Sequence, residues 1–181
     1  YRALGQIIGG VHSFDLETSG KTMGLTAYGR VVPAWKSAVH RFIRSYRPRR
    51  DQLASWEPAI ADGVFFLESF GPITGVDTFG GPADQAGQDF AATFQECWSE
   101  IVFDIAREAI DLAQCRNLCI TGGAALNAIT NRKILGLSDV GQVHFIPNPN
   151  DAGLAMGAAL HGYYRRQVDG FQGLRNPLSP F

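Results

Sequence analysis

The feature that most constrains the fold is an alternation of helix and strand patterns in the second half of the chain. Apolar residues recur every three or four positions from Phe90 to Leu112, with charged residues on the other faces, which predicts an amphipathic helix. Apolar runs predict a buried strand at residues 118–120 and a further strand at 143–146, and helices are predicted over residues 124–135 and 151–166. Strands that alternate with helices pair in parallel through right-handed crossovers. The sequence therefore predicts an α/β fold whose strands end at one sheet edge, where open α/β sheets bind ligands.

The first half of the chain is less regular. Residues 4–11 form a glycine-broken apolar segment that predicts a helix or a buried turn. Residues 34–46 predict a helix, with its apolar side chains on one side: Trp35, Val39, Phe42 and Ile43. Residues 51–83 are rich in Gly, Pro and Asp and give no clear prediction. Asp89 is the candidate cap or first-turn residue of the long helix.

Composition narrows the class of protein. The chain has 181 residues, 45% of them hydrophobic and 18% charged, which suits one globular domain and excludes a disordered segment. A net charge of −1 argues against a dedicated nucleic-acid binder. Five arginines between residues 41 and 50 predict a solvated helix end; a patch for an anionic partner or for a missing domain is the alternative.

The remaining features indicate a cytoplasmic protein without a membrane segment. No apolar run approaches the roughly 20 residues that span a bilayer. The most apolar stretch, residues 152–160, predicts a buried helix. The cysteines, at 97, 115 and 119, lack metal-site spacing, which predicts reduced structural thiols. The histidines, at 12, 40, 144 and 161, are interpreted as structural or surface residues.

The first motif that carries chemistry follows the first predicted strand. Gly122 and Gly123 let a ligand approach the backbone, because glycine has no Cβ. The helix that follows would direct backbone N–H groups at a phosphate. Asn127, about one turn later, could bind a ribose or a base edge. The alternative is a diglycine turn needed only for tight strand–helix packing.

The second motif follows the second predicted strand. Asp151 opens the final helix, and a run of small residues after it would let that helix lie close to a neighbour. An aspartate at a helix start is an ordinary N-cap. At this sheet edge, however, its carboxylate could also hold a divalent metal or a phosphate-bound water.

The third motif is Gly20-Lys21-Thr22, which ends like a phosphate-binding P-loop. The P-loop reading fails because Asp15 stands where the first glycine is required and no strand precedes it. Lys21, between glycines, could still act as a point charge toward a phosphate or a carboxylate.

Together, three segments resemble a known family. They read Gly-Lys-Thr-Met-Gly-Leu-Thr-Ala-Tyr-Gly at 20–29, Asn-Leu-Cys-Ile-Thr-Gly-Gly-Ala-Ala-Leu-Asn at 117–127, and Pro-Asn-Pro-Asn-Asp-Ala-Gly-Leu-Ala-Met-Gly-Ala-Ala at 147–159. Their order and spacing resemble the O-carbamoyltransferase family, which includes nodulation and antibiotic-modifying carbamoyltransferases. The resemblance extends from about residue 4 to about residue 164.

The resemblance implies a fold and a domain organisation. It implies a ribonuclease-H-like lobe of the actin/Hsp70/sugar-kinase fold, α/β with a mixed sheet and flanking helices. Residues 1–170 would form the C-terminal lobe of the nucleotide-binding domain. Residues 171–181 would be a linker toward a C-terminal domain, and the chain would be a fragment of a longer polypeptide.

The resemblance also implies a reaction. Full-length members convert carbamoyl phosphate and ATP to a carbamoyl-adenylate and transfer the carbamoyl group to a hydroxyl of a sugar-like or antibiotic acceptor. Gly122, Gly123 and Asn127 would bind the nucleotide, and Lys21 would contact phosphate. Asp151 would join histidines of a His-x-x-x-His motif in binding an iron-like divalent metal. That motif belongs to the preceding lobe and is missing here, so we expect the isolated fragment to be inactive.

Two alternatives stay open at this stage. The first is a sugar-kinase-type phosphotransferase of the same fold, which would need ATP but no carbamoyl phosphate. The second is a non-catalytic nucleotide-sensing module that docks a partner through the arginines at 41–50.

Overall fold

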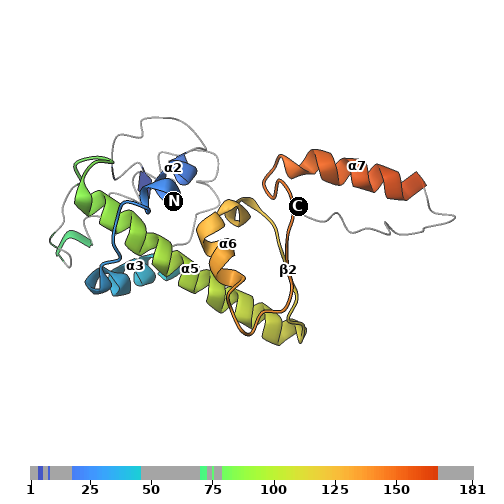
Figure 1. The fold of residues 1–181 in the computed structure, drawn as a ribbon, viewed down its shortest axis with the longest axis horizontal. Coiled ribbons are helices and arrows are strands. Elements are labelled where there is room, and N and C mark those ends of the chain that lie inside the picture. The colour runs from blue at the N-terminus through green and yellow to red at the C-terminus, as the bar shows by residue number, and fades with distance from the viewer. Residues whose placement is uncertain are drawn as a thin grey trace. The chain divides into compact units, whose positions relative to one another are not determined.

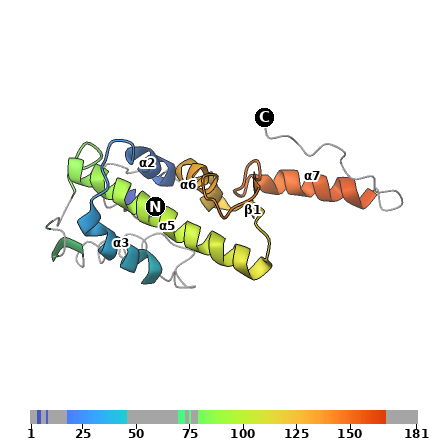
Figure 2. The ribbon, with the colours of Figure 1, turned by 60° about the horizontal axis from the view of Figure 1, so that its bottom comes forward.

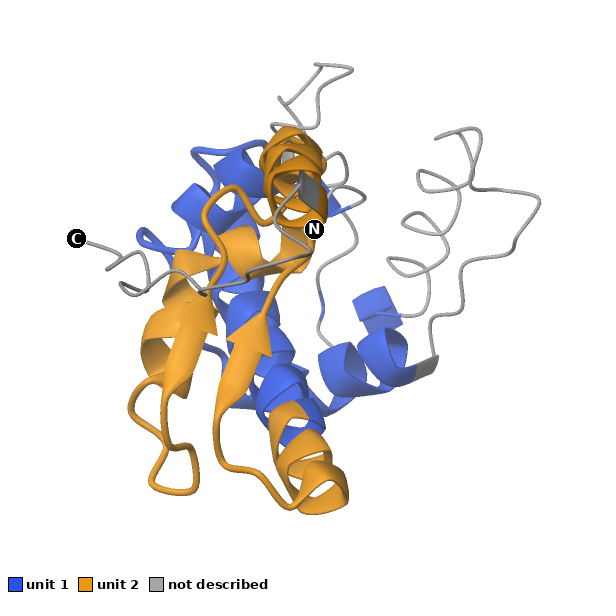
Figure 3. Cartoon of the chain, turned by 90° about the vertical axis from the view of Figure 1, so that its right-hand side faces the viewer, with its two compact units in different colours: residues 1–105 blue, residues 106–181 orange. Residues whose placement is uncertain are grey.

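The structure is a computed structural model, and it describes residues 4, 5, 8, 18–45, 70–72, 75 and 79–166. The chain divides into two compact units, residues 1–105 and 106–181 (Figure 3), and each is described by itself. The elements, in chain order (Figure 1), are α2 (Thr18–Leu25), α3 (Pro33–Ser45), α5 (Gln85–Ala113), β1 (Leu118–Ile120), the 3-10 helix η2 (Gly123–Leu126), α6 (Ala128–Ile134), β2 (Val143–Phe145) and α7 (Gly153–Arg166).

The core of the first unit forms where α3 lies beside α5 (Figures 1 and 2). Phe90 of α5 is its centre, with the Phe70 ring at 5.0 Å edge-on and the Phe79 ring stacked at 5.1 Å. The predicted apolar face of α3 is confirmed, since Val39 is fully buried and its other members pack against the core. The buried cluster also contains Leu4, Ile8, Ala38, Ala91, Phe94 and Cys97.

The long helix α5 begins four residues before the predicted cap, so the prediction for Asp89 is wrong. Asp84 precedes the first turn and accepts a hydrogen bond from the Ala86 N–H at 3.3 Å. Asp89 lies inside the helix, where it accepts a hydrogen bond from the backbone N–H of Arg30 at 2.8 Å. Asp84 thus lies at the start of the helix, and Asp89 serves the tertiary contact with Arg30.

The second unit contains the predicted parallel pair of strands. β1 and β2 pair in the register Leu118 with Val143, Cys119 with His144, and Ile120 with Phe145. Figure 3 shows both arrows pointing the same way. The prediction of a buried strand at 118–120 is wrong. Cys119 is exposed, as is its partner His144, because alternate strand residues face opposite sides and the side that these two share is open.

Two predicted helices of the second unit differ from expectation. The single helix predicted over residues 124–135 is split into η2 and α6, with Asn127 between them. The final helix begins at Gly153, two residues later than predicted, and is not buried, since Leu154 is 74% exposed. The small residues of this helix would allow another helix or a sheet to pack closely against it. Among the described residues no element covers α7, so the helix is exposed.

The described cysteines and clustered arginines lie partly in the core and partly at the surface. All three cysteines are free thiols, with Cys97 buried and the other two exposed. Of the five clustered arginines, Arg41 is exposed and Arg44 pairs with Asp104, while the other three lie outside the described residues. Among the described helices, none combines the length and apolarity needed to cross a membrane.

Candidate nucleotide-binding edge

The two loops that follow the strands are joined by a hydrogen bond. The N–H of Gly122 donates to the carbonyl oxygen of Pro149 at 2.8 Å. One step earlier, the Ile146 N–H donates to the Ile120 carbonyl oxygen at 3.4 Å, which prolongs the parallel pairing. The second and third family segments therefore meet at one edge of the sheet, as the strand order predicted.

The two glycines of the first loop differ in whether the backbone conformation requires glycine. Gly122 has φ 89° and ψ 164°, a conformation essentially restricted to glycine. Gly123 has no such dihedral, and a Cβ added at either position would meet no atom of the described residues within 4 Å. Tight strand–helix packing therefore does not explain Gly123, and the space beside both residues is open.

The element after the diglycine is shorter than predicted. Four residues form the 3-10 helix η2, in which the Ala125 N–H donates to the Gly122 carbonyl oxygen at 2.9 Å. The α-helix proper, α6, begins only at Ala128 and has seven residues. No long helix directs its dipole at the diglycine loop, contrary to the prediction, because Asn127 separates η2 from α6.

Asn127 has a structural role that the sequence analysis did not assign to it. It is 8% exposed, and its Oδ1 accepts a hydrogen bond from the Thr130 N–H at 3.0 Å, which caps α6. The neighbouring Asn131 side chain donates to the Ala125 carbonyl oxygen at 2.7 Å and ties α6 to η2. Its contact with a nucleotide stays a prediction.

Asp151 lies exposed in the turn that leads into α7. Asn150, one residue earlier, closes this turn: its Oδ1 accepts from the Ala152 N–H at 3.2 Å, and its carbonyl from the Gly153 N–H at 2.9 Å. Gly153 is required by packing, since an added Cβ would overlap the carbonyl oxygen of Asn148. Among the described residues no side-chain hydrogen bond reaches the Asp151 carboxylate, so the cap interpretation gains no support.

The remaining predicted residue, Lys21, lies in the first unit. It is exposed on the helix α2, in agreement with the rejection of a P-loop. Its contact with phosphate stays a prediction, as do the roles of Gly122, Gly123 and Asp151 toward ligands.

One group of polar residues escaped the sequence analysis. His40 of α3 lies against Glu100 of α5, with its Nε2 2.6 Å from Oε2, and Cys97 lies beside them. A signal was present: basic side chains recur every four residues in α3 (Lys36, His40, Arg44) and acidic ones in α5 (Glu100, Asp104). Residues four apart share a helix face, so the two rows could have been matched.

Comparison with known proteins places the chain in a family. The model described as carbamoyltransferase N-terminus matches residues 1–160. The chain is 30% identical over 146 residues to nodulation protein NolNO of Sinorhizobium fredii, covering 77% of this chain and 19% of that protein. It is 27% identical over 158 residues to nodulation protein U of Azorhizobium caulinodans, covering 81% of this chain and 27% of that protein.

A third relative extends the same pattern. The chain is 39% identical over 83 residues to nodulation protein NolO of Bradyrhizobium diazoefficiens, covering 45% of this chain and 15% of that protein. The chain thus spans about a quarter or less of the length of these relatives. Because the family model matches most of its residues, the chain belongs to the carbamoyltransferase family.

Proposed function

We propose that this chain is the nucleotide-binding lobe of an ATP-dependent carbamoyltransferase. The whole protein would use carbamoyl phosphate and ATP to form a carbamoyl-adenylate and would transfer the carbamoyl group to a hydroxyl of a sugar-like or antibiotic acceptor. The lobe would have the ribonuclease-H-like form of the actin/Hsp70/sugar-kinase fold. Family membership and the parallel β1–β2 pair with α6 in its crossover support this proposal.

The observation that carries the proposal is the hydrogen bond between Gly122 and Pro149. It holds the diglycine loop against the turn that leads to Asp151, so two motifs 29 residues apart share one sheet edge. Ligands of open α/β sheets bind at this edge. Neither the backbone conformation of Gly123 nor its packing against the described residues requires glycine, which supports a backbone that is left accessible to a ligand.

Each residue of the edge then has a proposed task. The backbone at Gly122 and Gly123 would admit the nucleotide without a side chain in its path. Asn127 would contact the nucleotide. Its Oδ1 already accepts a hydrogen bond from the Thr130 N–H, so a contact of Oδ1 with the nucleotide would share or replace this cap of α6. Lys21 would supply a positive charge to phosphate once the whole protein is assembled.

Asp151 is proposed to supply one ligand to an iron-like divalent metal. The residue fits this task, because its carboxylate is exposed and has no hydrogen-bond partner among the described residues. It belongs to no group of three or more potential metal ligands in that part of the chain, so further ligands would come from other residues of the polypeptide. A metal bound there would act as a Lewis acid toward carbamoyl or phosphate oxygens.

The test is a transfer assay with the full-length protein. It would be given carbamoyl phosphate, ATP and a panel of sugar-like and antibiotic hydroxyl acceptors, and products would be followed by mass spectrometry. We expect AMP, pyrophosphate and a carbamoylated acceptor. Asp151→Asn should reduce the rate by at least 100-fold, whereas Asp111→Asn, an exposed control on α5, should leave it unchanged.

Other outcomes would contradict the proposal in distinguishable ways. ADP and a phosphorylated sugar, formed without carbamoyl phosphate, would establish a sugar-kinase-type phosphotransferase. Nucleotide binding without turnover of any acceptor would favour a nucleotide-sensing module. Unchanged transfer by Asp151→Asn would remove the metal role but leave the carbamoyltransferase assignment intact.

A further inference from the structure

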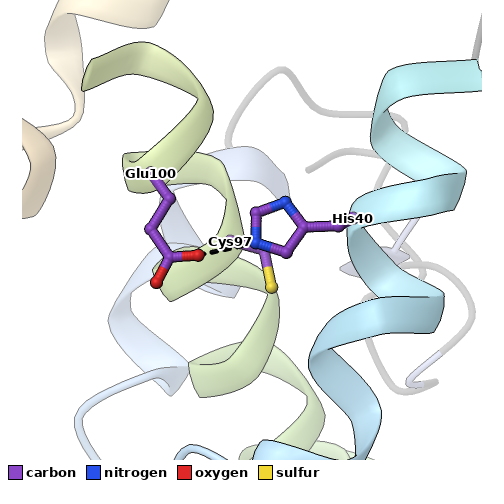
Figure 4. Close-up of side chains that lie close together, drawn as sticks. All are labelled: His40, Cys97 and Glu100. Carbon is purple, nitrogen blue, oxygen red and sulfur yellow. Dashed lines mark hydrogen bonds and ion pairs between the residues drawn. The ribbon is translucent and has the colours of Figure 1, made fainter. Parts of the chain in front are cut away.

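Three side chains of different chemistry converge between α3 and α5 (Figure 4). His40 comes from α3, and Cys97 and Glu100 come from successive turns of α5. One potential ligand atom of each, the imidazole nitrogen, the thiol sulfur and a carboxylate oxygen, lies within 4.8 Å of the other two. Figure 4 shows the imidazole directed at the carboxylate, with the sulfur beside it.

The packing of the two helices holds this group in place. Cys97 is 0% exposed and belongs to the buried cluster, and Val39, next to His40 in sequence, is also fully buried. Residues three apart on a helix project from the same face, which sets Cys97 and Glu100 side by side. Side chains on packed helices are more precisely placed than side chains on loops, as a binding site requires.

Lys36 contacts both Glu100 and Cys97 from outside the group of three side chains. Lys36 forms an ion pair with Oε1 of Glu100, whereas His40 contacts Oε2. Burial alone would raise the pKa of Glu100, but the hydrogen bonds from Lys36 and His40 outweigh it and lower that pKa. The Cys97 thiol lies 3.8 Å from the Lys36 carbonyl oxygen. Both the carboxylate and the thiol are thus oriented by the same residue.

We propose that His40, Cys97 and Glu100 form a binding site for a divalent cation of the zinc class. Histidine nitrogen, cysteine sulfur and carboxylate oxygen are the three kinds of ligand that zinc takes in proteins. Three protein ligands leave one tetrahedral position for water, and the half-buried His40 and Glu100 side chains give solvent access to it. The site is independent of the proposed transfer reaction and of Asp151.

The geometry is close to what such a cation needs. Ligand atoms around a tetrahedral zinc lie about 3.5 Å apart. On binding, His40 Nε2 and Glu100 Oε2, now 2.6 Å apart, would separate by roughly 1 Å, and the Cys97 sulfur, within 4.8 Å of the other two ligand atoms, would move toward the cation. The cation would replace the His40–Glu100 contact and bind both atoms. The Cys97 proton would leave to solvent as the thiolate binds, His40 would bind through Nε2 with its proton on Nδ1, and Lys36 would remain on the other carboxylate oxygen as an outer partner.

Titration of the intact chain with Co²⁺ tests this proposal. Cobalt serves as a spectroscopic substitute for zinc, and a cysteine ligand produces an intense thiolate-to-cobalt charge-transfer band in the near ultraviolet. We expect this band to grow to one equivalent of Co²⁺ and to disappear when Zn²⁺ is added. Zn²⁺ should also raise the melting temperature, because a ligand that binds only the folded state stabilises it.

Matched variants assign the ligands. Cys97→Ser should abolish the charge-transfer band, and His40→Gln should weaken Zn²⁺ binding at least tenfold. The control Cys119→Ser changes an exposed thiol of the second unit and should leave both signals unchanged. Circular dichroism of Cys97→Ser and of Cys97→Ala would verify that the variants fold. No band in the unmodified chain, or a band lost with Cys119→Ser and kept with Cys97→Ser, would overturn the proposal.

Discussion

Gly29 lies so close to the backbone of Gln88 that a Cβ added to it would overlap the Gln88 carbonyl oxygen. The segment after it continues along α5, with the Arg30 N–H bound to Asp89 at 2.8 Å and the Val32 N–H bound to Thr93 at 2.9 Å. Gly29 ends the first family segment. Close contact with a helix therefore explains why this segment ends in glycine.

Gly29→Ala should destabilise the chain by roughly 1–3 kcal/mol, because the overlap involves backbone on one side and the new Cβ on the other. Thermal or urea unfolding followed by circular dichroism measures the loss. Gly20→Ala is the matched control: Gly20 lies inside α2 with nothing within 4 Å, so alanine should be neutral or stabilising by up to about 1 kcal/mol. Equal effects of the two substitutions would show that the Gly29 contact is unimportant.

The two glycines at the proposed nucleotide edge should respond differently to alanine. Gly122→Ala should cost about 1–3 kcal/mol, since an L side chain is strained at its φ of 89°. Gly123→Ala should change the free energy of unfolding by no more than about 0.5 kcal/mol, because open space surrounds the new methyl group.

Gly123→Val adds a functional measurement to this comparison. It should leave the fold intact but weaken ATP binding to the full-length protein, as measured by calorimetry, if the backbone at Gly123 faces the nucleotide. Undiminished ATP binding by a folded Gly123→Val protein would contradict the role of this residue.

Asn127→Ala should lower stability by about 1 kcal/mol, because the Thr130 N–H would lose its side-chain acceptor at the start of α6. Asn127→Asp keeps an acceptor oxygen at the same position and should restore most of the loss. Chemical unfolding of the three proteins makes the comparison. If Asn127→Ala were as stable as the unmodified chain, the cap would contribute nothing measurable.

Asp139 should titrate below its usual range. The hydrogen bond from Arg107, 2.7 Å from Nε to Oδ2, is the main cause of the lowered pKa, and the charge of Arg116 acts in the same direction. Because the pKa is lower in the folded state, the stabilisation is present above the unfolded pKa and is lost as the pH falls through the folded one.

Carboxyl ¹³C NMR of Asp139 measures this titration. Arg107→Gln should move the pKa of Asp139 back toward its ordinary value, and added salt should reduce the shift because both partners are partly exposed. A pKa of Asp139 that does not change in Arg107→Gln would contradict the assigned cause.

Local periodicity was sufficient for much of the fold. The stripe from Phe90 to Leu112 gave the body of α5, and the apolar face of α3 gave the helix that packs on it. The change to short apolar runs gave two strands, and their separation by a helix gave the parallel pairing. These features depend on residues near one another in sequence, so they can be predicted from the periodicity of apolar residues.

Other features depended on contacts that no local pattern contains. Asn127 interrupts the predicted helix because its side chain caps α6, although the sequence allowed one continuous helix. The start of α5 was misplaced because Asp89 is used by Arg30, 59 residues away in sequence. The exposure of α7 depends on whether another element packs against it, and its own composition does not determine this.

The sequence by itself determined the family, the alternation of helices and strands, and the two loops that end at one sheet edge. Only the tertiary structure decided that Gly122 and Pro149 are bonded, that Gly29 rests on Gln88, and that His40 meets Cys97 and Glu100. The physical reason is range. Periodicity and turn chemistry act over a few residues, whereas these contacts join segments about 30 to 60 residues apart and form only when helices and strands pack.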